Sequence, residues 1–399
     1  MLPRTRFSFL SAAILLLSGS VLQGKASSPT LKVKGGEVAL ENVPVHAAVR
    51  VPGHLRKTPA DNIVVRLRAQ GIDASIPGQV FSLSKKEADV WWIIPSLPAG
   101  SEMTFEAALS EEKNKSCFSW KDQPNEHLDL LREDKKLLRY MYAYKSTEMR
   151  FDFNTSKPFH HVFDPQGEAT LTNGPGPGEI LYPHHRGIFI GWNKVMLEGQ
   201  RYDLWHTRNV AQVHQEFLEQ QAGPVAARSV SRIHWNDLSK EPILSERREI
   251  TVFAQPEPTH LLLEFQTAIT ALRDQVLLDG DPEHGGFQYR PHNDADKTRT
   301  QYLFHEEGID PRKDKDLPWV GESYVLRGNT YTVQHINHPS NPNPTIYSAY
   351  RDYGRFGAFF KKSLSKGETL HLKYRIWIAS GDHLDREAMQ RRWLAFCLQ

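Results

Sequence analysis

Residues 370–378 read Leu-His-Leu-Lys-Tyr-Arg-Ile-Trp-Ile, and residues 261–269 read Leu-Leu-Leu-Glu-Phe-Gln-Thr-Ala-Ile. In each stretch, apolar side chains recur at nearly every second position from the first. A period of two is typical of a β-strand, because successive side chains point to opposite faces. Such alternation predicts antiparallel strands that bury one face in a core. The two stretches therefore predict antiparallel β-structure for the second half of the chain.

Helical patterns are scarce, and the main one lies at the C-terminal end. In residues 382–398, Leu384, Met389, Trp393 and Phe396 could form an apolar stripe on one side of a helix. We therefore predict an all-β fold, in which a small β-sandwich precedes a large antiparallel β-sandwich that ends in a helix.

Turn residues and strand patterns divide the chain into two expected domains. Alternation over residues 63–68, with Pro-Gly turns nearby, predicts a small immunoglobulin-like β-sandwich over residues 31–120. The polar residues 121–126 are expected to form the linker. Residues 127–399 are expected to form the large sandwich with its C-terminal helix.

The N-terminus has the pattern of a secretory signal peptide. Arg4 and Arg6 precede an apolar run over residues 7–17, and small residues follow. We expect residues 1–26 to be the signal peptide and the protein to be exported to the periplasm or beyond the cell. An uncleaved anchor is the alternative, although the run is shorter than the ~20 residues of a membrane span.

Charge and cysteine content exclude several classes of protein. Lys and Arg number 49 and Asp and Glu number 47, so an electrostatic partner such as nucleic acid is not expected. No long apolar run follows the N-terminal segment, so we expect no membrane span there. Cys117 and Cys397 could pair in an oxidising compartment, but two cysteines form no disulfide framework.

Histidines concentrate in two parts of the chain. Of 18, six fall between residues 160 and 214 and five between residues 284 and 338. Both parts are rich in Gly, Pro, Arg and aromatic residues, which is typical of loops that carry function on a rigid sandwich.

The first of these parts contains His184 and His185 in the stretch Tyr-Pro-His-His-Arg-Gly-Ile-Phe-Ile-Gly-Trp, residues 182–192. The pattern places Arg186 on one strand face with Ile188, Ile190 and Trp192. Adjacent histidines on a strand point to opposite faces, so the pair would not ligate one metal unless the chain bends there. One buried and one exposed histidine is the alternative interpretation.

Three further segments combine aromatic, basic and acidic residues. Asp203, Trp205 and His206 resemble the sugar-facing end of a strand, or else ordinary packing at an edge strand. Residues 287–292 alternate so that Gln288, Arg290 and His292 share one face, which is unusual unless they line a cleft. Residues 350–354, Tyr-Arg-Asp-Tyr-Gly, follow a Pro-rich loop.

These motifs together resemble the PmoA-like family of exported bacterial proteins, which are often labelled methane oxygenase PmoA. The resemblance covers residues 127–385 and rests on the stretches 182–192, 285–292, 336–354 and 366–382. At residues 348–354 and 319–324 the chain departs from the usual family pattern, which suggests a subfamily. The resemblance implies a β-rich protein with a glycan-related role. A membrane methane oxygenase subunit would need several apolar spans, and we expect none.

We therefore predict an exported enzyme that cleaves or modifies a carbohydrate, by β-elimination or hydrolysis, with a carbohydrate or other small molecule as its ligand. The residues predicted to carry catalysis are His185, Arg186, His292, Arg351 and Tyr353. The residues predicted to bind the substrate are Trp192, Asp203, Trp205, His206, Tyr289 and Arg290.

We expect His185, Arg186, His206, His292 and Arg351 to line one cleft, with His185 or His292 as the general acid or base. A carbohydrate-binding protein without turnover is one alternative. A metal-dependent enzyme with histidine ligands from different loops, including an oxygenase, is the other, although the sequence requires no cofactor.

Overall fold

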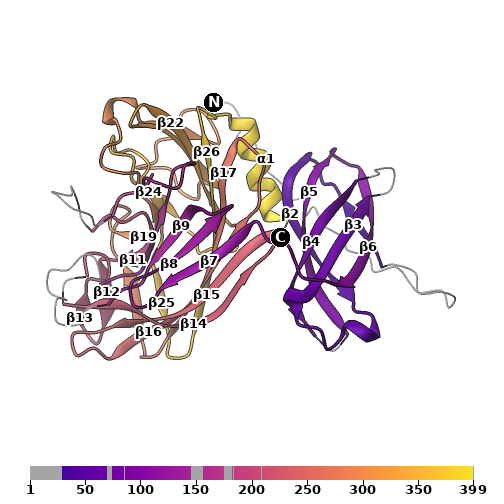
Figure 1. Ribbon diagram of the computed structural model, residues 1–399. Helices are drawn as coiled ribbons and strands as arrows, with labels where there is room; N and C mark the ends of the chain where they lie inside the picture. Colours follow the sequence, from indigo (N-terminus) through magenta and orange to yellow (C-terminus); the bar gives the residue numbers. More distant parts are fainter. Residues whose placement is uncertain are drawn as a thin grey trace. The chain divides into compact units, whose positions relative to one another are not determined.

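The protein was analysed as a computed structural model (Figure 1) that describes residues 29–69, 74–84, 86–144, 156–174, 182, 184–207 and 209–398. The chain divides into two compact units, residues 1–114 with 394–399, and residues 115–393. Strands dominate both units, which confirms the predicted all-β fold with one C-terminal helix. The predicted signal peptide lies outside the described residues.

The first unit is built on one antiparallel sheet of six strands. Its order is β1-β6-β3-β4-β5-β2. The strands are β1 (Thr30–Lys34), β2 (Leu40–Arg50), β3 (Ile63–Ala69), β4 (Ser75–Leu83), β5 (Glu87–Leu97) and β6 (Glu102–Glu111), with short 3₁₀ helices η1 (Gly53–Leu55) and η2 (Ala60–Asn62). Alternate residues of β3, among them Val65 and Leu67, are buried in the core of this unit as their spacing predicts.

The second unit contains two sheets of eight strands, both antiparallel. The first has the order β23-β24-β19-β11-β10-β9-β8-β7. Its strands are β7 (Phe118–Gln123), β8 (His127–Arg132), β9 (Lys135–Met141), β10 (Phe159–Val162), β11 (Ile188–Trp192), β19 (Gly285–Tyr289), β23 (Ile346–Tyr347) and β24 (Phe356–Phe359).

The second large sheet has the order β14-β15-β16-β17-β26-β22-β21-β20. Its strands are β14 (Ala211–Ala222), β15 (Ala226–Asn236), β16 (Pro242–Phe253), β17 (Thr259–Ala271), β20 (Gln301–Phe304), β21 (Trp319–Leu326), β22 (Asn329–Asn337) and β26 (Thr369–Ser380). A small sheet has the order β13-β12-β18-β25, with β12 (Lys194–Leu197), β13 (Gln200–Tyr202), β18 (Val276–Asp279) and β25 (Lys362–Leu364). A 3₁₀ helix, η3 (Lys297–Arg299), precedes β20.

One hydrophobic core joins the two large sheets. Leu263 and Phe265 of β17 and Tyr374 of β26 meet Ile188 of β11 and Phe287 of β19 in it. The alternation in residues 261–269 and 370–378 thus predicts correctly which face of β17 and β26 is buried. At about 25 cal/mol per Å² of buried apolar surface, such a core is the main stabilising contribution to the fold.

The polar residues 121–126, expected to be a linker, instead form the end of β7 and the turn that leads to β8. Lys121, Asp122 and Gln123 end β7 and pair with the beginning of β8, and a turn follows. Strand β7 is the last in its sheet, so its polar side chains face solvent along an edge. An edge hairpin explains the polar composition as well as a linker does.

The C-terminal helix, α1 (Arg386–Cys397), begins later than its apolar pattern suggests. Within the second unit, its first two turns lie on the outer faces of β21, β22 and β26. Trp319 Nε1 donates to Gln390 Oε1 over 2.8 Å, and Gln334 Nε2 donates to the Met389 carbonyl over 2.8 Å. The Arg392 guanidinium lies 3.6 Å from the centre of the Trp377 ring. None of the described helices is long and apolar enough to cross a membrane.

Arg248 and Glu246 form a fully buried ion pair in the sandwich. Arg248 donates through Nε and Nη2 to the two oxygens of Glu246, over 2.8 and 2.9 Å, and neither side chain reaches solvent. Trp235 Nε1 and Thr267 Oγ1 donate to the same carboxylate over 2.8 and 2.9 Å. Four donors of this cluster are satisfied by one carboxylate, so its removal leaves several buried polar atoms without a partner.

We expect Glu246→Gln to lower the free energy of unfolding by about 3–5 kcal/mol, because Arg248 then keeps a buried charge without a counterion. Urea denaturation followed by tryptophan fluorescence measures the loss. Glu216→Gln is the control, since Glu216 pairs with Arg232 at the surface and should change stability by less than about 1 kcal/mol. Equal losses in the two variants would contradict this account of the core.

Candidate functional site

The two faces of β11 differ completely. Ile188, Ile190 and Trp192 point into the main core. Phe189 points to the other face, where it joins a separate cluster, and Gly191 shares that face by alternation. The second face therefore offers space where a side chain would otherwise stand.

Glycine allows a loop to lie directly on this second face. Gly191 pairs with Gly286 of β19 in the antiparallel register. A Cβ on Gly191 would lie 2.6 Å from the Leu204 carbonyl oxygen, and one on Gly286 would lie 1.9 Å from the Ala358 carbonyl oxygen. The loop after β13 and the strand β24 can approach this closely only because both positions lack a side chain.

The loop over Gly191 presents an imidazole that a carboxylate holds in place. Asp203 accepts backbone hydrogen bonds from Trp205 and His206 over 3.2 and 2.9 Å. The same carboxylate lies 2.9 Å from Nδ1 of the His206 ring. A carboxylate can only accept, so Nδ1 of His206 carries the proton and Nε2 keeps its lone pair.

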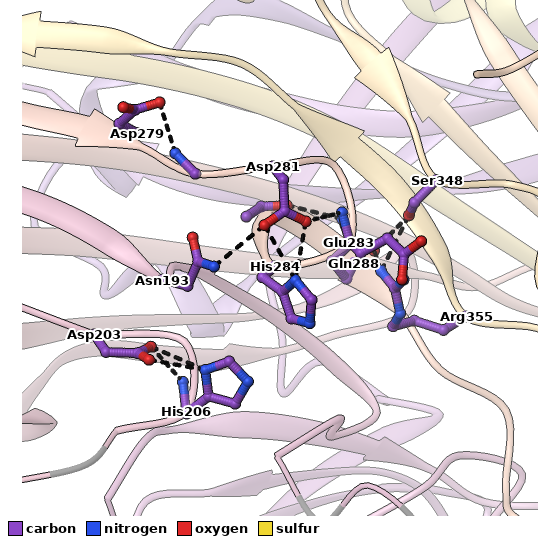
Figure 2. Close-up of polar contacts among 12 residues, drawn as sticks. Asn193, Asp203, His206, Asp279, Asp281, Glu283, His284, Gln288, Ser348 and Arg355 are labelled. Carbon is purple, nitrogen blue, oxygen red and sulfur yellow. Dashed lines mark hydrogen bonds and ion pairs between the residues drawn. The ribbon is translucent and has the colours of Figure 1, made fainter.

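A second turn repeats this arrangement beside the start of β19 (Figure 2). Asp281 accepts from the backbone of Glu283 over 3.0 Å, and its carboxylate lies 2.9 Å from Nδ1 of the His284 ring. Asn193 Nδ2 donates to the other oxygen of Asp281 over 3.2 Å. The Nε2 lone pair of His284 is therefore also available to a ligand.

His184 completes a group of three histidines. Its ring centre lies 4.4 Å from that of His206, which in turn lies 5.3 Å from that of His284. One potential ligand atom from each ring lies within 4.8 Å of the others, and no further such group of His, Cys, Asp or Glu occurs among the described residues. Three imidazoles at this separation are a ligand set of catalytic zinc sites.

The electrostatics of the trio favour the form that binds metal. Burial, followed by the neighbouring His206, lowers the pKa of His184 to about 2, so this imidazole is neutral at pH 7. Burial raises the pKa of Asp203, but the hydrogen bonds with His206 lower it by more. The pKa of Asp203 is therefore below its ordinary value. Neutral imidazoles with ionised carboxylates behind them are the arrangement that orients and strengthens histidine ligands.

His185 lies beside the trio but points elsewhere. Its ring centre is 4.3 Å from that of His184 and 5.9 Å from that of Tyr353, and the residue is 3 % exposed. Neither ring nitrogen bonds to any described protein group. Burial, followed by the charge of Arg355, holds the pKa of His185 well below its usual range.

A cationic cluster adjoins these rings. Arg355 is fully buried and donates through Nη1 to Gln288 Oε1 and Ser348 Oγ, each over 3.1 Å. Glu283, next to His284, accepts from Arg351 Nη2 over 2.6 Å and from the Tyr350 hydroxyl over 2.7 Å. Figure 2 shows Arg355 beside Glu283 and Gln288.

The structure brings part of the predicted site together. His185 contacts Tyr353, and the Arg290 guanidinium lies 4.9 Å from the centre of the Tyr353 ring. His206 and Asp203 belong to the histidine trio and its support, and Arg351 reaches the same region through its ion pair with Glu283. These contacts bring His185, His206 and Arg351 into one region of the second unit.

Two residues expected in the same cleft lie differently. Arg186 is buried, and its Nη1 donates to the Lys157 carbonyl over 3.0 Å. It does not share the core face of Ile188, because Gly187 adopts a φ of +31° and turns the chain between them. The side chain of His292 contacts the backbone N–H of Asp294 and the guanidinium of Arg327.

Three aromatic residues expected to stack on a sugar are buried. Trp192 donates to the Phe360 carbonyl over 3.1 Å, and the hydroxyl of Tyr289 lies 2.8 Å from that of Tyr324; both rings belong to the main core. Trp205 packs on Phe189 beneath the histidines. With no exposure, none of the three rings offers a face to a sugar, so this prediction is wrong for them.

The site also contains residues that the sequence patterns do not assign to it. His184, His284, Asp281 and Arg355 are the main ones. A signal for three of them exists, because Asp-x-x-His occurs at residues 203–206 and again at residues 281–284, and a histidine pair precedes β11. The turn built by Asp-x-x-His explains the spacing, since the aspartate caps the turn and reaches the imidazole three residues later.

The sequence matches a family model described as "Family of unknown function (DUF6807)" over residues 127–394, which is more than half of the chain. This match does not test the resemblance to PmoA-like proteins, which stays a prediction. No curated protein matches the sequence. Among solved structures, a "putative aldose 1-epimerase" from Klebsiella pneumoniae subsp. pneumoniae MGH 78578 is 9 % identical, with 89 % of this chain and 96 % of that chain covered and a TM-score of 0.29. At that TM-score, the likeness carries no argument for this chain.

We expect Gly191→Ala to displace the loop that carries His206, because the added Cβ would meet a backbone oxygen rather than a movable side chain. Overpacking of this kind costs about 1–3 kcal/mol of stability, which thermal unfolding measures. Gly53→Ala is the control, since a Cβ there meets nothing within 4 Å. Equal melting temperatures for Gly191→Ala and the wild type would show that the loop does not need this close approach.

Proposed function

We propose that this chain, which belongs to the family of unknown function DUF6807, is a metal-dependent enzyme that acts on a carbohydrate. We further propose, from the pattern of residues 1–26, that it is exported.

The observation that carries the metal site is the geometry of His184, His206 and His284. Three imidazoles converge so that one nitrogen of each lies within 4.8 Å of the others, and two of the rings have Nδ1 fixed by an aspartate. A histidine that only fills a core needs no such support, whereas metal-bound histidines almost always have it. Imidazole ligands suit Zn²⁺ and also the other divalent transition metals.

The residues around the trio supply what an enzyme needs besides the metal. A bound divalent metal would polarise a substrate oxygen and lower the pKa of a bound water. Asp203 and Asp281 fix the tautomers of their histidines. His185 presents two nitrogen atoms that bond to no described protein group, so either of them can form a hydrogen bond with a substrate. Phe189 and the buried Trp205 lie beneath the histidines, with the ammonium group of the buried Lys157 4.1 Å from the centre of the Phe189 ring.

The carbohydrate class is supported by the resemblance to glycan-related exported proteins and by the side chains around the trio. Tyr182 is 41 % exposed and its ring contacts those of His184, His185 and Tyr353. An exposed aromatic ring beside imidazole, carboxylate and guanidinium groups is a surface that a sugar can bind.

We expect the purified protein to hold about one metal ion per chain, as sites of three histidines do. His206→Ala and His284→Ala should each lose that metal and, on the responsive member of a glycan panel, lose turnover by about 10²-fold or more. Elemental analysis by mass spectrometry and a product assay measure the two effects.

The control for both variants is His371→Ala, since His371 is exposed on β26 and should keep metal and turnover. Circular dichroism confirms that each variant is folded. Metal retained by His206→Ala and His284→Ala would contradict the assignment. A metal-bound wild type that binds glycans without turning over any of them would instead indicate a carbohydrate-binding protein.

The aspartates give a second, finer test. Asp203→Asn should weaken metal binding by about 10–100-fold, because the supporting carboxylate is lost while the three histidines stay. Competition with a chelator of known affinity measures the change. Asp294→Asn serves as the control, since Asp294 pairs with Arg327 and His292 rather than with the trio. An unchanged affinity in Asp203→Asn would show that the Asp203–His206 pair is only structural.

A further inference from the structure

We propose that the substrate is a sugar acid, whose carboxylate binds the buried guanidinium groups of Arg355 and Arg290 next to the histidine trio. This inference rests on the proposed function, because it names the substrate class of the same site. It is carried by the charges, the hydrogen bonds and the placement of these two side chains.

Arg290 has no anionic hydrogen-bond partner among the described residues. Its guanidinium donates to the carbonyls of Pro291 and Tyr353 and to Asn293 Oδ1, each over 2.6 Å. The residue is only 1 % exposed. Burial of a cation with neutral partners alone is costly, so a counterion is expected at such a position.

Arg355 is similarly placed. Its hydrogen bonds go to the neutral side chains of Gln288 and Ser348. The carboxylate of Glu283 lies 3.7 Å away from Nη2, but Arg351 holds that carboxylate much more closely, at 2.6 and 2.7 Å. One carboxylate thus serves two arginines, and the shorter contacts belong to the exposed one.

The other nearby carboxyl group does not balance the charge. Glu322 is fully buried, and burial raises its pKa well above the usual range, against the opposing effect of Arg290. Neither oxygen of Glu322 accepts a hydrogen bond from a described arginine, so this carboxyl group forms no direct ion pair with Arg290 or Arg355. A bound metal would add further positive charge.

Both arginines also keep donors for a ligand. Nε and Nη2 of Arg355 and Nε of Arg290 are buried, and no described group accepts a hydrogen bond from them. Both ring nitrogens of His185 are also buried and form no hydrogen bond with a described group. A guanidinium offers its donors in a planar fork that matches the two oxygens of a carboxylate, which is why arginine rather than lysine suits this role.

The placement of these donors connects them with the trio. Tyr353 contacts the ring of His185 on one side and the guanidinium of Arg290 on another. The charges of Arg355 and Arg290 both act on His185, whose ring lies 4.3 Å from that of His184. A carboxylate held by the arginines would therefore leave the hydroxyl-bearing carbons of the same molecule close to the histidines.

The test measures binding of matched ligands to the wild-type metal-loaded protein by calorimetry. The panel contains uronates and aldonates, each beside its neutral amide, together with inorganic phosphate and sulfate. The acids should bind at least about 10-fold more tightly than their amides, as a charge-assisted pair requires. Equal affinities across every acid–amide pair, or a preference for phosphate or sulfate over all the acids, would overturn the proposal.

Variants then locate the carboxylate. Arg355→Gln should weaken the preferred acid by roughly 10- to 100-fold, as loss of one charged partner does, while the amide and the metal content stay unchanged. Arg327→Gln, at an exposed pair with Asp294, is the matched control. An unchanged affinity for the acid in Arg355→Gln would overturn the assignment to this residue.

Metal content separates this inference from the proposed function. A protein that binds sugar acids through Arg355 but holds no metal would refute the metal-dependent enzyme and keep the carboxylate site. A protein that holds the metal but binds acids and amides equally well would refute the carboxylate site and keep the metal-dependent enzyme. The wild-type comparison of acids with amides stands even if Arg355→Gln does not fold.

Discussion

The close packing of backbone on the outer face of β11 and β19 is the constraint on which the site depends. On the inner face these strands bury Ile188, Trp192 and Phe287 in the core between the two large sheets. On the outer face, Gly191 leaves no Cβ where the Leu204 carbonyl oxygen lies, and Gly286 leaves none where the neighbouring strand β24 approaches. The loop that ends in His206 can rest on the sheet only because Gly191 lacks a side chain. Because the loop packs directly on the backbone of a rigid sheet, its position is fixed by that sheet.

The Asp-x-x-His turns orient the imidazole rings that this packing positions. Each aspartate accepts backbone hydrogen bonds that fix the turn and also accepts from Nδ1 of its own histidine. The two turns lie far apart in sequence and meet because β19 pairs with β11. His184 enters from the segment before β11, so three separate parts of the chain supply one ligand each. Arg290 and Arg355 add positive charge on one side of this trio. That charge is the basis for proposing an anionic substrate.

The sequence predicts the fold better than the site, and the reason is physical. Alternation along β17 and β26 reports burial directly, because one face of each strand lies in the core. The same alternation divides β11 into two faces but does not tell which face is buried, so Trp192 was assigned to the site and Gly191 was not. Asp203 and His206 stand three residues apart, and Asp281 and His284 repeat that spacing, so both turns carry a local signal. Arg355 carries no such signal, because its partners Gln288 and Ser348 come from other segments and strand pairing cannot be read from local sequence. His292 stands in an equally polar segment, yet its side chain bonds near Asp294 and Arg327.

The central claim is that His184, His206 and His284 hold one metal ion. Crystals of the metal-loaded protein, measured on both sides of the absorption edge of the metal found by elemental analysis, test this most directly. The account predicts one strong anomalous peak about 2.0–2.1 Å from Nε2 of His206 and of His284 and from one nitrogen of His184, the distance of a zinc–imidazole bond. A peak at any other site, or a fully loaded crystal with no peak among these three rings, would contradict it.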